Sequence, residues 1–467
     1  MSQTIATTAS LEAVDNKFPS QIKYIVGNEA CERYSYYGMK SILVVFMIQV
    51  LLFQESQATF TYHIFSSLCY FFPLLGAFIS DRIWGKYKTI LYLSLVYCMG
   101  HLVLSVWENE MGLYFGLGLI ALGSGGIKPC VSAHVGDQFK ANQQHLLKKV
   151  YELFYFMINF GSFFSTLVTP WTLKHYGPSV AFGIPGVLML IATFVFWMGR
   201  TEFVHVPPTK SDGHGFFAVL FAAMGNQKTR KTGESFLDAA KAAGHTQEHV
   251  DATKAVLDIA KLFAAISVFW ALFDQHGSSW VIQAMNMNLE FMGMQFEASQ
   301  ISAWNPIMVM GLIPLFSMGF YPLLDKMGFK TTPIRRITWG MFVAAAAFGI
   351  VALIQMAMDA GGAENKINVM WQFFPYLVMT MAEVMVSITG LEFAYTQAPR
   401  AMKSSVMSIW LLTVFFGNLI TAYVSKINFF PTASTGYFFF FAALMGIFAL
   451  IFWYMGLQYK TKNYMEK

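Results

Sequence analysis

Long apolar stretches alternate with short polar ones along almost the whole 467-residue chain. A helix needs ~20 mainly apolar residues to cross a bilayer, because it rises only ~1.5 Å per residue. The pattern therefore predicts an all-α membrane protein with twelve membrane-spanning helices. Their expected ranges are 21–52, 57–80, 88–107, 111–136, 148–174, 178–199, 253–282, 294–324, 332–358, 369–399, 403–425 and 436–459.

One long polar interval divides these spans into two groups of six. Residues 201–252 contain Pro207 and Pro208, mixed charges and an apolar run at 216–224 that is too short to span. We expect this interval to be a cytoplasmic linker with an interfacial or soluble amphipathic helix. The expected organisation is an N-terminus at 1–20, bundles at 21–200 and 253–459 on either side of the linker, and a tail at 460–467.

Composition agrees with this picture, since 56% of the residues are hydrophobic and only 12% are charged. All but six of the 31 Lys and Arg residues fall in segments that the span count puts on one side of the membrane. The exceptions are Lys174, Lys366 and Lys426 in opposite loops, and Arg33, Lys40 and Lys128 within spans. This asymmetry predicts cytoplasmic termini, and it explains the net charge of +5 without a nucleic-acid partner.

The sequence also lacks the features of several other classes of protein. The four cysteines, Cys31, Cys69, Cys98 and Cys130, all lie in apolar stretches, so no disulfide framework is expected. The first 17 residues are polar and lack the apolar core of a signal peptide. No zinc-protease or serine-hydrolase motif is apparent, so we expect no metal, no cofactor and no enzyme.

The first span carries an unusual group of charges. Glu29, Glu32, Arg33 and Lys40 share a broad helix face with Tyr36 and Tyr37. An ionised side chain at the bilayer centre costs at least ~2.5 kcal/mol, so these groups should face protein or water and pair with one another. This favours a substrate or ion path. The alternative is a helix whose first two turns lie in the cytosol as a solvated face.

Charges in other spans suggest what that path carries. Arg33 and Lys128 in the first half suit a carboxylate, while Glu383 in the second half suits an ammonium. Opposite poles across one cavity describe a zwitterion, such as a free peptide or amino acid. Lys128 lies between several glycines and Pro129, where a ligand or backbone can approach closely.

Proton coupling requires a titratable group whose charge responds to its partner or to substrate. The candidates are Glu29, Glu32, His63, Asp274 and Glu383. His63 could instead be an ordinary hydrogen-bonding residue between helices. Tyrosines and tryptophans could line pockets for varied side chains, although aromatic residues in spans also serve in packing and at the membrane interface.

Five ordered motifs resemble the proton-dependent oligopeptide transporters of the major facilitator superfamily, and the chain is similar to a bacterial member that resembles mammalian intestinal peptide transporters. The segment Glu29-Ala-Cys-Glu32-Arg33 resembles the family's first-helix motif, and 76–85 its second-to-third-helix signature. The segments 154–162, 269–275 and 390–399 resemble its later signatures. The resemblance implies a twelve-helix major facilitator fold and proton-coupled symport of di- and tripeptides through the cell inner membrane.

The resemblance also implies roles for particular residues. The peptide carboxylate would be held by Arg33, Lys128 and Asn159, and the amino end by Glu383 and Asn305. The side-chain pockets would be shaped by Tyr37, Tyr70 and Trp270. Proton coupling would involve Glu29, Glu32, His63 and Asp274, and Lys40 would form an outer gate pair with Asp274.

The chain departs from the family pattern at a few places. Lys40 stands where an arginine is usual, which weakens a bidentate gate bond, and Tyr34 replaces the usual phenylalanine. The linker lacks the two extra helices that many bacterial relatives insert. Two alternatives remain open at this point: a carrier of nitrate or another small anion on the same fold, and a membrane-embedded enzyme.

Overall fold

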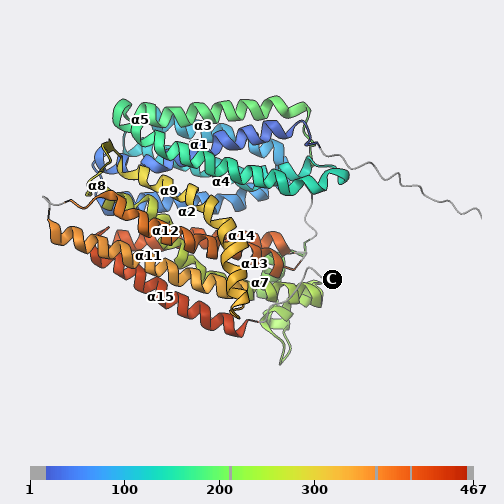
Figure 1. Cartoon of the computed structure of the whole chain (residues 1–467). Coiled ribbons are helices and arrows are strands. Elements are labelled where there is room, and N and C mark those ends of the chain that lie inside the picture. Colours follow the sequence, from blue (N-terminus) through green and yellow to red (C-terminus); the bar gives the residue numbers. More distant parts are fainter. Residues whose placement is uncertain (1–16, 210–212, 363–365, 400–401, 460–467) are drawn as a thin grey trace, which may run out of the picture.

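The computed structural model of the chain describes residues 17–209, 213–362, 366–399 and 402–459. The described residues are almost entirely helical (Figure 1). In the first half, the helices are α1 (Ile22–Gln49), α2 (Glu55–Ile79), α3 (Lys86–Val106), α4 (Glu110–Asp137) and α5 (Leu147–Met198), with a π segment η1 (Ser80–Trp84) and 3-10 turns η2 (Ala141–Leu146) and η3 (Gly199–Thr201).

Helix α5 is 52 residues long and contains two of the expected spans. The chain turns at Gly177, whose φ of 82° and ψ of 177° suit only a residue without a Cβ atom. Pro178 then begins the second part, where its missing N–H costs nothing. With α2, α3 and α4, this gives five of the six expected spans before the linker as helices long and apolar enough to cross a membrane. Helix α1 is 28 residues long, and its crossing of the membrane stays a prediction.

The second half has the helices α7 (Gln247–Phe273), α8 (Ser279–Met285), α9 (Trp304–Pro314), α10 (Tyr321–Lys326), α11 (Pro333–Gly361), α12 (Phe373–Glu383), α13 (Thr389–Gln397), α14 (Lys403–Ile427) and α15 (Thr435–Gln458). The 3-10 segment η6 (Asp274–Gly277) and the π segments η8 (Leu315–Phe320) and η10 (Val384–Ile388) join helices end to end. The 3-10 segments η7 (Ala298–Ala303) and η9 (Val369–Gln372) lead into α9 and α12. Six further spans result.

Two expected boundaries differ from the structure. The linker ends earlier than expected, because α7 begins at Gln247 rather than at residue 253. The span placed at 294–324 begins instead at Ala298, because the preceding residues form a small antiparallel hairpin of β1 (Glu290–Phe291) and β2 (Met294–Gln295). Met292 and Gly293 at its turn both have positive φ. Met294 therefore lies in this hairpin and not in the helix.

Close packing holds the charged face of α1 in place. Helix α1 packs along α5, and a Cβ atom at Gly161 would lie 3.1 Å from the carbonyl oxygen of Ala30 and the amide nitrogen of Tyr34. The two backbones therefore approach closely beside Arg33. Across the two halves, α2 packs against α14.

The linker contains the ten-residue helix α6 (Phe216–Gly225), the short turn η4 (Gln227–Thr229) and the 3-10 helix η5 (Phe236–Ala243). Helix α6 is too short to span a bilayer, and it packs against η5 beside the start of α7. Figure 1 shows the linker in light green at one end of the molecule, while α8 lies at the opposite end. We call the first the linker end. We call the second the hairpin end, because the β1–β2 hairpin follows α8 in the chain.

Candidate functional site

A cavity of about 270 Å³ lies between the two halves. Residues of α1, α2, α5, α7, α9 and α12 line it, so both bundles contribute. Eight residues that the resemblance gives a role are among them: Tyr37, Lys40, Tyr70, Asn159, Trp270, Asp274, Asn305 and Glu383.

Glu383 forms the acidic pole of this cavity. It is the last residue of α12, directly before the π segment η10, and its Oε2 accepts a 2.8 Å hydrogen bond from Nδ2 of Asn305. The same amide nitrogen lies 3.1 Å from Oγ1 of Thr380. No Lys or Arg of the described residues forms a salt bridge with Glu383. The carboxylate therefore retains capacity for a cationic ligand.

Three of the four α1 charges pair with one another, as the sequence predicts, whereas Lys40 pairs with Asp274. Nε of Arg33 lies 2.8 Å from Oε1 of Glu29 and 2.6 Å from Oε2 of Glu32, and all three residues are buried. This excludes the alternative in which these turns form a solvated face. Glu29, Glu32 and Arg33 are not among the residues that line the cavity.

Lys128 lies beside the cavity rather than in its wall. Its Nζ is 4.2 Å from the ring centre of Tyr70 and 5.6 Å from that of Tyr36, and both rings line the cavity. These are cation–π contacts. In this conformation, Arg33 and Lys128 therefore do not face the chamber that Glu383 faces, and their binding of a carboxylate stays a prediction. Asn159 does line the cavity, where its Nδ2 donates to the carbonyl oxygen of Tyr155.

The expected outer gate pair is in contact. Nζ of Lys40 lies 3.2 Å from Oδ1 of Asp274, with side-chain exposures of 12% and 7%. Oδ2 of Asp274 accepts a 2.6 Å hydrogen bond from Nδ2 of Asn418. Oδ1 of Asn418 lies 2.7 Å from Nδ1 of His63, whose Nε2 lies 2.8 Å from Oγ of Ser278.

This arrangement indicates which ring nitrogen of His63 carries a hydrogen. Because the Asn418 amide gives its NH2 group to a carboxylate, its oxygen can only accept, so Nδ1 of His63 carries a hydrogen. The sequence analysis missed Asn418 and Ser278. The available signal was an amide in the middle of the apolar span 403–425.

Several polar contacts join the two halves toward the hairpin end. Besides the pairs above, Nζ of Lys174 lies 2.7 Å from Oε1 of Glu297, and Nε2 of Gln300 donates to the carbonyl oxygen of Leu167 at 2.6 Å. These contacts connect the two bundles near that end.

Comparison with known proteins identifies the family. The sequence profile described as "PTR2: POT family" matches residues 87–438, which is well over half of the chain. The chain belongs to the POT family.

Relatives of this POT-family chain carry the names of peptide transporters. It is 41% identical over 360 residues to "Peptide transporter family 1" of Drosophila melanogaster, covering 73% of this chain and 48% of that protein. It is 37% identical over 398 residues to "Solute carrier family 15 member 2" of Homo sapiens, covering 81% and 54%. The chain spans about half the length of the curated relatives it matches.

Solved structures match along nearly the whole chain. An "auto inhibited POT family peptide transporter" has a TM-score of 0.88 at 38% identity, and "the POT family transporter PepTSo" has a TM-score of 0.90 at 39%. Each comparison covers 96% of this chain and 99% of the other. The expected major facilitator fold is thus confirmed, and this POT-family chain is a multi-pass membrane protein.

Proposed function

We propose that this POT-family chain carries di- and tripeptides across the cell inner membrane in symport with protons, by alternating access. The observation that carries the proposal is the position of Glu383 in a cavity shared by both bundles, with an amide rather than a cation as its partner. The ammonium group of a peptide would supply the cation that pairs with the Glu383 carboxylate. The names of the relatives point to the same substrate class.

The other end of the peptide is assigned to Arg33, Lys128 and Asn159. Glu29 and Glu32 now neutralise Arg33, and Tyr36 and Tyr70 cover Lys128. A carboxylate entering between these groups competes for the cations and releases a glutamate, which then binds a proton. Substrate binding and proton binding therefore favour each other, because the carboxylate replaces a glutamate at the cation and the proton neutralises the displaced glutamate.

The outer gate would respond to a second protonation. Lys40 and Asp274 hold the halves together, and the Asn418 amide connects Asp274 to His63. A proton on His63 or Asp274 weakens the pair and lets the bundles rock open toward the hairpin end. The linker end would then face the cytoplasm, together with both termini.

Glu383 also argues against the alternative of an inorganic-anion carrier. An anion without an ammonium has no favourable contact to make with a carboxylate in the same cavity. Tyr37, Tyr70 and Trp270 in the cavity wall suit the varied side chains of peptides, because their large surfaces do not demand one shape.

Uptake into proteoliposomes tests the proposal. Labelled dialanine should accumulate under an inward proton gradient, and excess unlabelled tripeptide should suppress the signal, while excess nitrate should not. Glu32→Gln should lose gradient-driven accumulation but keep peptide counterflow. Uptake that ignores the gradient, or that nitrate rather than tripeptide suppresses, would refute peptide symport.

A further inference from the structure

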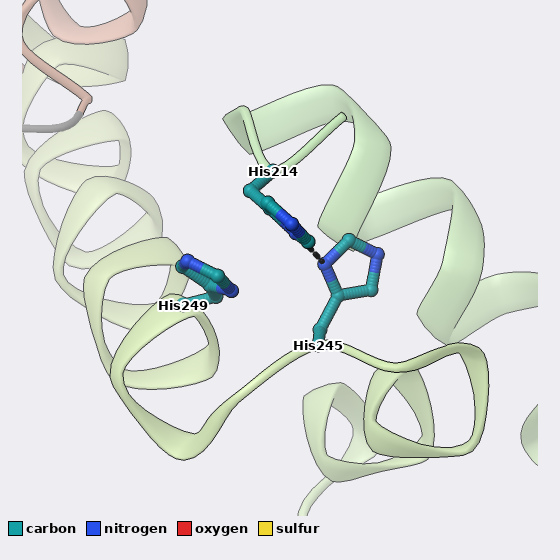
Figure 2. Close-up of side chains that lie close together, drawn as sticks. All are labelled: His214, His245 and His249. Atoms are coloured by element: carbon teal, nitrogen blue, oxygen red, sulfur yellow. Dashed lines mark hydrogen bonds between the residues drawn. The ribbon is translucent and has the colours of Figure 1, made fainter. Parts of the chain in front are cut away.

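Three histidines from separate parts of the linker meet at its junction with α7 (Figure 2). His214 precedes α6, His245 follows η5, and His249 lies in the first turn of α7. One ring nitrogen from each lies within 4.8 Å of the others. Neither the peptide cavity nor the outer gate includes any of the three.

The spacing of the rings matches the needs of a metal ion. Nitrogen ligands ~2.0–2.1 Å from a tetrahedral zinc ion lie ~3.3 Å from each other. Nδ1 of His214 is 3.3 Å from Nδ1 of His245. The ring of His214 also lies over that of His249, with centroids 4.4 Å apart and planes 16° from parallel. The ligand atom of His249 lies within 4.8 Å of the other two, so coordination of one ion requires its side chain to rotate.

The three side chains differ in their access to solvent. His245 is 9% exposed while His214 is exposed, so an ion has a route from solvent.

Metal binding would replace existing contacts, among them the hydrogen bond between Nδ1 of His214 and Nδ1 of His245. Nδ1 of His249 accepts a hydrogen bond from the backbone N–H of Thr246, which is long at 3.3 Å. The Thr246 hydroxyl oxygen caps the same turn by accepting from the His249 N–H. The helix start therefore keeps a cap if His249 turns toward a metal.

We propose that His214, His245 and His249 form a site for a divalent transition metal, with zinc the best match, that ties the linker to the first turn of α7. Three imidazoles are a ligand set suited to Zn²⁺, Ni²⁺ or Cu²⁺, with water completing the coordination. The site would connect the segment entering α6 with the first helix of the second bundle. The proposal is independent of which substrate the cavity carries.

Metal analysis of the purified full-length protein tests the site, with any polyhistidine tag removed. After incubation with Zn²⁺ and gel filtration, one zinc per chain should remain, and Co²⁺ should produce visible absorption bands of tetrahedral coordination. His245→Gln should weaken Co²⁺ binding at least tenfold. His214→Gln provides a second variant, at an exposed position where folding is not at stake.

His205→Gln is the matched control, because His205 is another linker histidine and its Nε2 contacts the carbonyl oxygen of Arg200. It should bind metal as the unsubstituted protein does. The proposal is overturned if the unsubstituted protein retains no zinc, or if His245→Gln and His214→Gln bind Co²⁺ with unchanged affinity. In that case the three rings are held together by stacking and hydrogen bonding alone.

Discussion

At the scale of single residues, Glu383 is the main candidate for binding the peptide ammonium. Substitution by glutamine removes its charge with little change in size. Glu383→Gln should weaken the apparent affinity for dialanine at least tenfold, because a charge-assisted hydrogen bond contributes ~1.5–3 kcal/mol. Competition between labelled and unlabelled dialanine in proteoliposomes measures this. Preference for dialanine over its N-acetylated form should fall in parallel.

Glu392→Gln is the control for this prediction, since Glu392 lies on α13 with an exposed side chain. It should leave both affinity and preference unchanged. Equal affinities in Glu383→Gln and the unsubstituted protein would show that the ammonium binds elsewhere.

Asn418 is a second residue whose importance appears only in three dimensions. Asn418→Leu should lower the free energy of unfolding by ~1–3 kcal/mol, because Asp274 and His63 each lose a buried hydrogen-bond partner. Thermal unfolding in detergent measures the loss. Thr413→Val on the same helix is the control, since its hydroxyl donates to Trp410 within α14. Equal melting temperatures for the two variants would contradict the assigned role.

At the scale of elements, the turn within α5 depends on backbone conformation rather than on contacts. Nothing lies within 4 Å of a Cβ atom at Gly177, yet its φ of 82° is unfavourable for any other residue. Gly177→Ala should therefore destabilise the protein by ~1–3 kcal/mol through backbone strain alone. Circular dichroism melting in detergent provides the measurement.

Gly118→Ala separates strain from the general effect of adding a methyl group. Gly118 lies within α4, and a Cβ atom there also meets nothing within 4 Å. In a regular helix, alanine is favoured over glycine by ~0.5–1 kcal/mol, so this variant should be unchanged or slightly more stable. Destabilisation of both variants to the same degree would rule out strain at Gly177.

At the scale of the whole molecule, contacts near the hairpin end keep the two bundles together, and a buried pair should matter more than an exposed one. Lys40→Ala leaves Asp274 without its cation and should open the cavity toward that end. A membrane-impermeant maleimide should then label Ser41→Cys several-fold faster from that side. The four natural cysteines are replaced by alanine in this background.

Lys174→Ala is the comparison for Lys40→Ala. Its partner is Glu297, and side-chain exposures of 50% and 23% reduce the value of this pair to ~0–1 kcal/mol. Labelling should change little. If Lys40→Ala also leaves the labelling rate unchanged, the pair is no gate.

The sequence by itself determined the membrane class and the pairing of Arg33 with Glu29 and Glu32 on α1. These follow from local rules: the bilayer sets the length of an apolar helix, and a charge inside it must find a partner nearby. Arg33 reaches Glu29 and Glu32 within its own helix, so no knowledge of packing was needed.

Only the tertiary structure decided which candidates share a chamber. A helix pattern does not define how far each helix is rotated toward its neighbours, so it could not separate Glu383 in the cavity from Lys128 beside it. The contact of Lys40 with Asp274, the Asn418 link and the meeting of three linker histidines all join residues far apart in sequence. Such contacts depend on how the elements pack together. Burial requires each polar group to find a partner, but it does not specify which distant residue supplies that partner.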